Sequence, residues 1–188
     1  MKTTCGTLIA AVGLALLSAC GGGNGKGQGP GADTLAAGRI HAMEDSLYAN
    51  PGFDRKGAQA LLDVYLAYAK LHPLDSLTPE YLFRGANLKS SMGDPQGSIG
   101  LYDRIIRDFP HWKKIPDSYY LKAFTIDNGL GQKGEAEQAY QVVIGKFPDN
   151  RFAKDAAQMI ENLKYTDEEL MAKFKEMNPD STQAVVGK

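Results

Sequence analysis

Apolar side chains recur three and four positions apart from Asp33 onward, the spacing that places them on one face of an α-helix. Four segments show this pattern most clearly. Their apolar positions are Leu61, Leu62, Tyr65, Leu66 and Ala69; Ile99, Tyr102, Ile105, Ile106 and Phe109; Ala136, Ala139, Tyr140, Val143, Ile144 and Phe147; and Phe152, Ala153, Ala156, Ala157, Ile160 and Leu163. Strand signals are weak, because the flanks of the turn-forming pair Asn128-Gly129 do not alternate. The pattern predicts an all-α fold.

Helix start signals agree with this periodicity. Thr78-Pro79-Glu80 and Asp94-Pro95-Gln96 each place a capping residue directly before a proline, which suits the first helical position. Residues 166–169, Thr-Asp-Glu-Glu, form a capping-box sequence that opens a last helix. The residues of this helix expected to face inward are Leu170, Phe174 and Met177.

The helical pattern also repeats at a fixed interval. Met92-Gly93 recurs as Leu130-Gly131, and Phe109-Pro110 recurs as Phe147-Pro148, in both cases 38 residues later. The same interval relates Tyr81 to Tyr119, Tyr102 to Tyr140, and Ile106 to Ile144. A fainter earlier copy ends at Leu71-His72-Pro73, where Pro73 precedes Pro110 by 37 residues. Each unit therefore reads as a helix, an apolar-Gly turn, a tyrosine-bearing second helix and an aromatic-Pro stop.

This unit resembles the tetratricopeptide repeat, whose typical length of about 34 residues is extended here in the loop between units. The resemblance implies a right-handed superhelix of about three helix pairs plus capping C-terminal helices, spanning residues 32–178. Two features depart from the family pattern. Asn50-Pro51-Gly52 interrupts the first unit, and Phe124 stands where its counterpart Ala86 is small. We expect a looser or shifted helix contact at Phe124.

The first twenty residues read as a targeting sequence. Lys2 precedes an apolar run, Leu8–Leu17, that is shorter than the about 20 residues needed to span a bilayer, which is typical of a secretory signal. Leu17-Ser18-Ala19-Cys20 resembles the lipobox of bacterial lipoproteins. The alternative is an ordinary signal peptide with an incidental cysteine. The lipobox resemblance implies removal of residues 1–19 and a diacylglycerol and an N-acyl chain on Cys20.

Residues 20–31 are glycine-rich and predict a flexible tether, and residues 179–188 predict a flexible tail. Gly21 follows the cysteine where an aspartate would favour inner-membrane retention, so the lipoprotein resemblance implies the outer membrane, facing the periplasm. The stretch from Phe147 to Ala157, followed by Thr166–Leu170, resembles small tetratricopeptide lipoproteins of diderm bacteria. In style it is similar to the tetratricopeptide lipoprotein of the outer-membrane β-barrel assembly machinery.

Composition argues against several kinds of chemistry. The chain has 21 Lys+Arg against 22 Asp+Glu, without the basic excess of a nucleic-acid binder. Cys5 and Cys20 both precede the folded part, and the three histidines, His41, His72 and His111, are far apart in sequence, so no metal site is expected. Gly129–Gly134 matches a dinucleotide fingerprint, but a helix rather than a strand is expected before it. We expect that the protein is not an enzyme and that it carries no cofactor besides the lipid.

In tetratricopeptide proteins the first helix of each pair lines a concave groove that receives a peptide or a partner helix. By this resemblance the groove candidates are Glu80, Phe83, Asn87 and Ser90, with Ser118, Leu121 and Thr125 from the next unit. Mere solvent exposure of these residues is the alternative. They lack the lysine and arginine cluster that clamps an acidic carboxylate, and His72 is expected to be a packing residue.

The loop His111–Lys114 is basic and aromatic. It is either a solvated connection with Trp112 half packed, or a contact for a partner or a membrane surface. The function we expect is a non-enzymatic adaptor that docks another envelope protein or peptide, as an accessory of assembly or secretion. It would touch the membrane through its lipid anchor alone. The alternative is a structural envelope lipoprotein that associates with itself.

Overall fold

The computed structural model describes residues 30–49 and 52–177 of the 188 in the chain, and no strand occurs within them. The helices are α1 (Pro30–Tyr48), α2 (Arg55–Leu71), α3 (Thr78–Ser91), α4 (Pro95–Asp108), α5 (Ile115–Phe124), α6 (Lys133–Lys146), α7 (Arg151–Asn162) and α8 (Asp167–Met177), with a π-helix η1 (Thr125–Gly129) directly after α5. The all-α prediction is confirmed. Within the described ranges, none of the helices has the length and apolar character of a membrane span.

The segments assigned to the signal, residues 1–19, to Cys20 and to the tail, residues 179–188, lie outside the described residues. So does most of the expected tether. Helix α1 begins at Pro30, so Pro30 and Gly31, the last two residues assigned to the tether, are helical.

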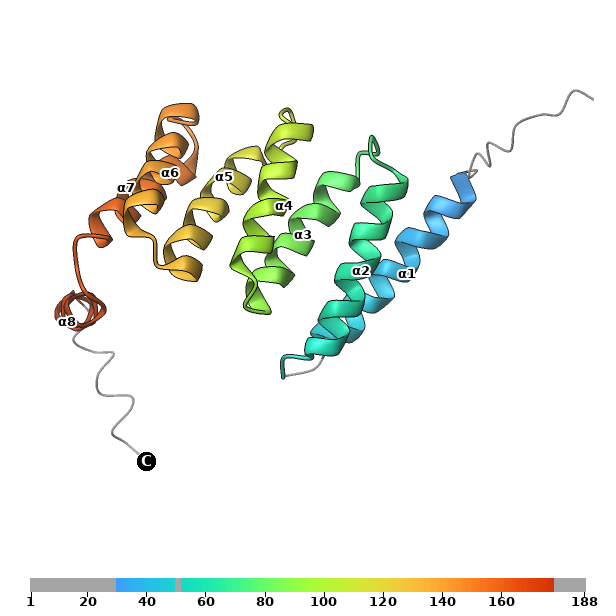
Figure 1. Ribbon diagram of the computed structural model, residues 1–188, viewed down its shortest axis with the longest axis horizontal. Helices are drawn as coiled ribbons and strands as arrows, with labels where there is room; N and C mark the ends of the chain where they lie inside the picture. Colours follow the sequence, from blue (N-terminus) through green and yellow to red (C-terminus); the bar gives the residue numbers. More distant parts are fainter. Residues whose placement is uncertain (1–29, 50–51, 178–188) are drawn as a thin grey trace, which may run out of the picture.

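Consecutive helices pack in a single row, α1 on α2, α3 on α4 and α5 on α6, and each pair also contacts the next one (Figure 1). Helix α7 packs against α6 and α5, whereas α8 lies at the end of the row beyond it. This arrangement gives the three predicted helix pairs followed by C-terminal helices, as in a tetratricopeptide-type superhelix.

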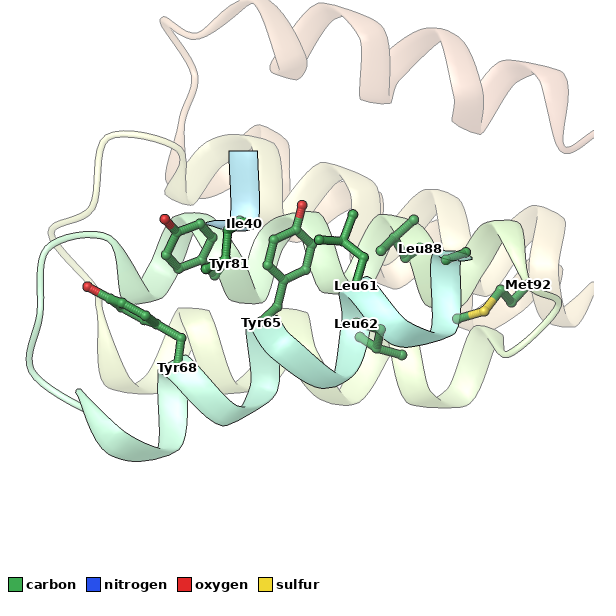
Figure 2. Packing of buried hydrophobic residues seen from close by; sticks show 9 residues of the cluster. Ile40, Leu61, Leu62, Tyr65, Tyr68, Tyr81, Leu88 and Met92 are labelled. Carbon is green, nitrogen blue, oxygen red and sulfur yellow. The ribbon is translucent and has the colours of Figure 1, made fainter. Parts of the chain in front are cut away.

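Three tyrosines at equivalent positions fill the space between the helices. Tyr65, Tyr102 and Tyr140 lie on α2, α4 and α6, and each is at most 1% exposed. In the first cluster, Tyr65 stacks on Tyr81 of α3 with a centroid separation of 5.4 Å (Figure 2). Large buried aromatic rings contribute most of the stabilisation of such small layers. The predicted apolar faces of α2, α4 and α6 therefore do form the core.

Two of the three predicted capping signals are confirmed. The Asp94 side chain accepts a 2.8 Å hydrogen bond from the Gly97 N–H, and Thr166 and Glu169 exchange the two bonds of a capping box, at 2.8 and 3.2 Å. The third signal was wrong. Thr78 is the first residue of α3 rather than its cap, and its hydroxyl donates to the His72 carbonyl at 2.5 Å.

The inward face predicted for the last helix was also wrong in part. Leu170 is half-buried, but Phe174 and Met177 are 58% and 69% exposed. The physical reason is that α7 presents exposed polar side chains, including Gln158, so it offers little apolar surface for α8 to cover. On α7 itself, Ala157 is exposed as well, whereas Ala153 and Ala156 are buried.

The interval between units is not uniform. Helices α3 and α5 start 37 residues apart, at Thr78 and Ile115, but the glycines in the turns between the two helices of each unit, Gly93 and Gly131, are 38 apart. Both glycines have positive φ, at 78° and 67°, as expected for a left-handed helix end. The additional residue lies in η1, because a π-helical turn accommodates one extra residue.

This insertion changes which residues correspond. Before η1 the interval is 37, so Tyr81 corresponds to Ser118 rather than to Tyr119. Ala86 likewise corresponds to Ala123, and both alanines are 0% exposed. Phe124 is therefore not the counterpart of Ala86, and the looser or shifted contact expected there was based on the wrong interval. The expected loop extension is confirmed, since residues 72–77 and 109–114 separate the units, against only 147–150 before α7.

Candidate protein-binding face

Helices α1, α3 and α5, the first members of the three pairs, are linked by a chain of charged side chains. Arg84 of α3 bonds Glu44 of α1 at 2.5 Å through Nη1 and Glu80 at 2.9 Å through Nε. Lys114, directly before α5, reaches Glu80 Oε2 at 2.8 Å. We call the surface formed by these three helices the first-helix face.

Hydrogen bonds from two cationic neighbours hold Glu80 in its ionised form. Burial acts to raise the pKa of Glu80, but hydrogen bonds from Lys114 and Arg84 outweigh it, so that the pKa lies below its usual value. The Tyr65 hydroxyl donates to Glu44, and burial together with this bond raises the pKa of the tyrosine. Since two cations face two carboxylates, the network does not present an excess positive charge to an acidic partner. Its role is to fix the first helices relative to one another.

Four of the predicted groove residues lie on α3. Glu80 belongs to the ionic network, and Asn87 and Ser90 are exposed. The Asn87 side-chain oxygen accepts a 2.6 Å hydrogen bond from the Tyr102 hydroxyl. Phe83 is only half-buried, but its ring packs edge-on against Tyr102 at 5.9 Å. Phe83 is therefore tied to the core and is not held solely for a partner.

The aromatic loop before α5 packs on the same residue. Trp112 is half-buried and meets Phe83 edge-on at 5.6 Å, with the Lys114 ammonium 5.1 Å from the Phe83 centroid. Of the two interpretations of this loop, the half-packed one is correct for Trp112. His72 lies 4.6 Å from Tyr68, ring to ring, and so has the packing role predicted for it.

Two residues of the third helix pair predicted to line the groove, one on α5 and one at the start of η1, are buried instead. Ser118 and Thr125 are 0% and 4% exposed, and their hydroxyls donate to the carbonyls of Lys114 and Leu121 at 2.9 and 2.7 Å. They were predicted because they lie 38 residues after Glu80 and Asn87, whereas the two units are 37 residues apart ahead of η1. Leu121, selected in the same way, is half-buried and packs on the second core cluster.

With the correct interval, Glu80, Phe83 and Asn87 correspond to three residues that sequence reasoning missed, Asp117, Tyr120 and Phe124. The spacing of Pro79 and Pro116, 37 residues, was the signal that could have revealed them.

Phe124 is 40% exposed on this face. Tyr120 lies beside it, with ring centroids 6.5 Å apart, and stacks on Phe152 of α7 at 4.7 Å. The Arg151 guanidinium lies 4.5 Å from the Phe152 centroid. Burial, assisted by Asp155 and Asp127, raises the pKa of Tyr120. The C-terminal part of the first-helix face is thus an aromatic row edged by charge.

Nothing in the described part of the chain groups three His, Cys, Asp or Glu side chains as a metal ion would need. What the face offers is an extended surface of aromatic and polar side chains. Stacked helix pairs of this kind create the surfaces on which repeat proteins bind other proteins.

Residues 117–150 match the tetratricopeptide repeat family. The matched segment runs from α5 through η1 and α6 to the loop before α7. No curated protein sequence matches the chain. Tetratricopeptide repeats generally mediate protein–protein interactions, which fits a protein partner for this chain. The match covers most of the third helix pair, and the two pairs before it share its architecture, which supports the assignment of the chain as a tetratricopeptide-repeat protein.

Proposed function

We propose that this chain is a lipid-anchored adaptor of the bacterial cell envelope. In this proposal the acyl chains on Cys20 hold it to the outer membrane, and the repeat domain faces the periplasm. Its first-helix face docks a segment of another envelope protein, in the service of assembly or secretion. The proposed role needs no catalytic residue and no cofactor besides the lipid.

The observation that carries the docking proposal is the exposure of Phe124 on the first-helix face. Its position corresponds to Asn87 of the preceding unit, so an aromatic and an amide stand at equivalent places along the same surface. Phe124 keeps 40% of its surface exposed although Tyr120 and Phe152 continue the aromatic row behind it. Aromatic residues with some exposure, backed by packed neighbours, are typical anchors of protein interfaces.

The ionic network supports the proposal in a second way. Because Glu44, Arg84, Glu80 and Lys114 connect α1, α3 and the start of α5, the face is already ordered before a partner arrives. A pre-ordered surface loses less conformational entropy on binding. The balanced charges favour a partner segment that uses apolar and hydrogen-bonding groups over an acidic peptide tail.

Site-specific photo-crosslinking in living cells tests the docking face. A photoreactive amino acid is placed at Asn87 or at Phe124, and at Gln141 on α6 as the control. All three positions are exposed. We expect the first two positions to crosslink the same envelope protein and Gln141 not to do so. Equal crosslinking from all three positions, or crosslinking from Gln141 alone, would contradict a binding site on the first-helix face.

A further inference from the structure

Helix α8 carries the most exposed apolar surface of the C-terminal half. Met171, Phe174 and Met177 are 61%, 58% and 69% exposed, and Leu170 is half-buried beside them. Among the described helices none packs extensively against α8, which is set apart at the end of the row (Figure 1). Helix α8 is nevertheless well formed, since the Thr166–Glu169 capping box opens it. An ordered helix with an open apolar row needs a covering surface.

A cavity of about 760 Å³ lies between α7 and this row. Gln158 and Asn162 of α7 line one wall, and Leu170, Met171, Lys173, Phe174, Lys175 and Met177 line the other. The cavity is open, so a segment from outside can enter it. Its walls combine apolar side chains with two amides and two lysines, which suits a second amphipathic helix that carries carboxylates.

The charges of α8 differ along its length. Its first turn holds only acidic residues, Asp167, Glu168 and Glu169, whereas its second half holds Lys173 and Lys175 together with Glu176. At about 100° per residue, Glu169 and Lys173 border one edge of the apolar row, and Glu168 and Lys175 border the other. Within its own chain, Lys173 lies 4.1 Å from the centroid of the Tyr165 ring and so remains at that edge.

This pattern is self-complementary in one orientation. When two copies of α8 pair antiparallel, each edge of one helix faces the same edge of the other. Glu169 then stands opposite Lys173 of the second copy, and Glu168 opposite Lys175. The first pairing is centred on Met171 and the second between Met171 and Ala172, so a single register brings both pairings to within one residue of direct opposition. In a parallel pair the two acidic ends would lie side by side, which is unfavourable.

We propose that the α7–α8 end is a homodimer interface in which α8 of a second copy enters the cavity, antiparallel to the first. The interface is isologous, since the same patch serves both copies. Helix α8 alone, with 11 residues, is too short for the about 800 Å² per partner of a stable complex, so the α7 wall is part of the interface. Apolar burial supplies most of the affinity, and the charges set the orientation.

Charge reversal tests the proposal in the full chain, purified in detergent, with sedimentation velocity as the readout. The acidic variant is Lys175→Glu, and the basic variant is Glu168→Lys. Glu169 is left unchanged because it belongs to the capping box of α8. We expect a wild-type dimer, and for each variant a dimer dissociation constant at least about tenfold weaker, because like charges then face each other. An equimolar mixture of the two variants should recover a dimer containing one copy of each.

The matched control is Lys56→Glu on α2, which makes the same charge change as the acidic variant at an exposed position far along the row. It should leave the dimer intact, and circular dichroism should show equal helix content in all variants. A monomeric wild type overturns the proposal. So does a dimer that the reversals do not weaken, or a mixture that fails to recover it. None of these results bears on the first-helix face, whose crosslinking sites do not involve α8.

Discussion

The Tyr102 hydroxyl donates a 2.6 Å hydrogen bond to the side-chain oxygen of Asn87, so a core residue of α4 positions a residue of the first-helix face. The other two pairs repeat this relationship. Tyr65 donates to Glu44 of α1, and Tyr140 donates to Asp127 of η1 at 3.4 Å. Each buried tyrosine thus fills the space between two helices and bonds a polar side chain of the preceding helical segment. The same three tyrosines therefore pack the core of the repeats and hold polar side chains of the first helical segments in place.

These tyrosines predict a loss of stability in alkali. Burial raises the pKa of Tyr65, Tyr102 and Tyr140 above the ordinary value of 10.0. The unfolded chain therefore releases these protons at lower pH than the folded one, and the free energy of unfolding falls as the pH rises above about 10. The urea midpoint, measured from pH 8 to pH 11, should decrease over this window. It should decrease less steeply for Tyr102→Phe; an identical slope in that variant would contradict the assignment.

The ionic network predicts that Arg84 stabilises the fold. Removal of its guanidinium in Arg84→Ala leaves the carboxylate of Glu44, whose side chain is 8% exposed, without its cation. A buried polar group that loses such a partner lowers the free energy of unfolding by about 1–3 kcal/mol. Arg107→Ala is the control, since that side chain is 68% exposed, and it should change stability by no more than about 0.5 kcal/mol. Chemical denaturation measures the free energy of unfolding of both variants. Equal losses of stability would mean that the network does not hold the helices together.

The close approach of the π-helix to α4 predicts that alanine substitutions at two glycines change stability in opposite directions. A Cβ at Gly129 would lie 2.7 Å from the Pro95 Cβ, so Gly129→Ala forces η1 away from α4 and should cost about 1–3 kcal/mol. Gly100, in the interior of α4, has nothing within 4 Å of such a Cβ. Gly100→Ala should therefore stabilise the helix by about 0.5–1 kcal/mol. Thermal melts that shift both variants in the same direction would contradict the close approach of η1 to α4.

The proposed lipid anchor leads to a prediction for the variant in which Cys20 is replaced. In Cys20→Ala the thiol that would carry the diacylglycerol is absent, so the precursor should remain uncleaved or be released as a soluble periplasmic protein. Incorporation of radiolabelled palmitate into the wild-type chain, and its loss in the variant, is the measurement. A wild-type chain that takes up no label would remove the basis for the proposed membrane location.

Much of the fold was predictable because helical periodicity and repeated residues report packing directly. The buried faces of α2, α4 and α6 follow from apolar spacing, and the helix ends at Gly93 and Gly131 follow from the need for positive φ. The inward face of α8 was not predictable from its own residues, because the side chains that α7 presents decide whether an apolar row is covered.

The candidate site was predicted less well, for a reason confined to one turn. A π-helix has no strong sequence signature, so the additional residue in η1 could not be located. The 38-residue interval was therefore applied to the whole unit, including the positions ahead of η1 where the interval is 37. The error moved the expected surface from Phe124 to the buried Thr125. On α3, where no such residue intervenes, Asn87 and Ser90 do lie exposed as expected.

The most direct test of the adaptor function compares Phe124→Ser with Val142→Ser. The two side chains are 40% and 41% exposed, but Phe124 lies on the first-helix face and Val142 on α6. Both variants should keep the helix content and nearly the melting temperature of the wild type. We predict that partner recovery after in-cell crosslinking from Asn87 falls at least about tenfold for Phe124→Ser, as for an anchor worth more than about 1.4 kcal/mol, and stays unchanged for Val142→Ser. Unchanged recovery in Phe124→Ser, with the fold intact, would contradict the account.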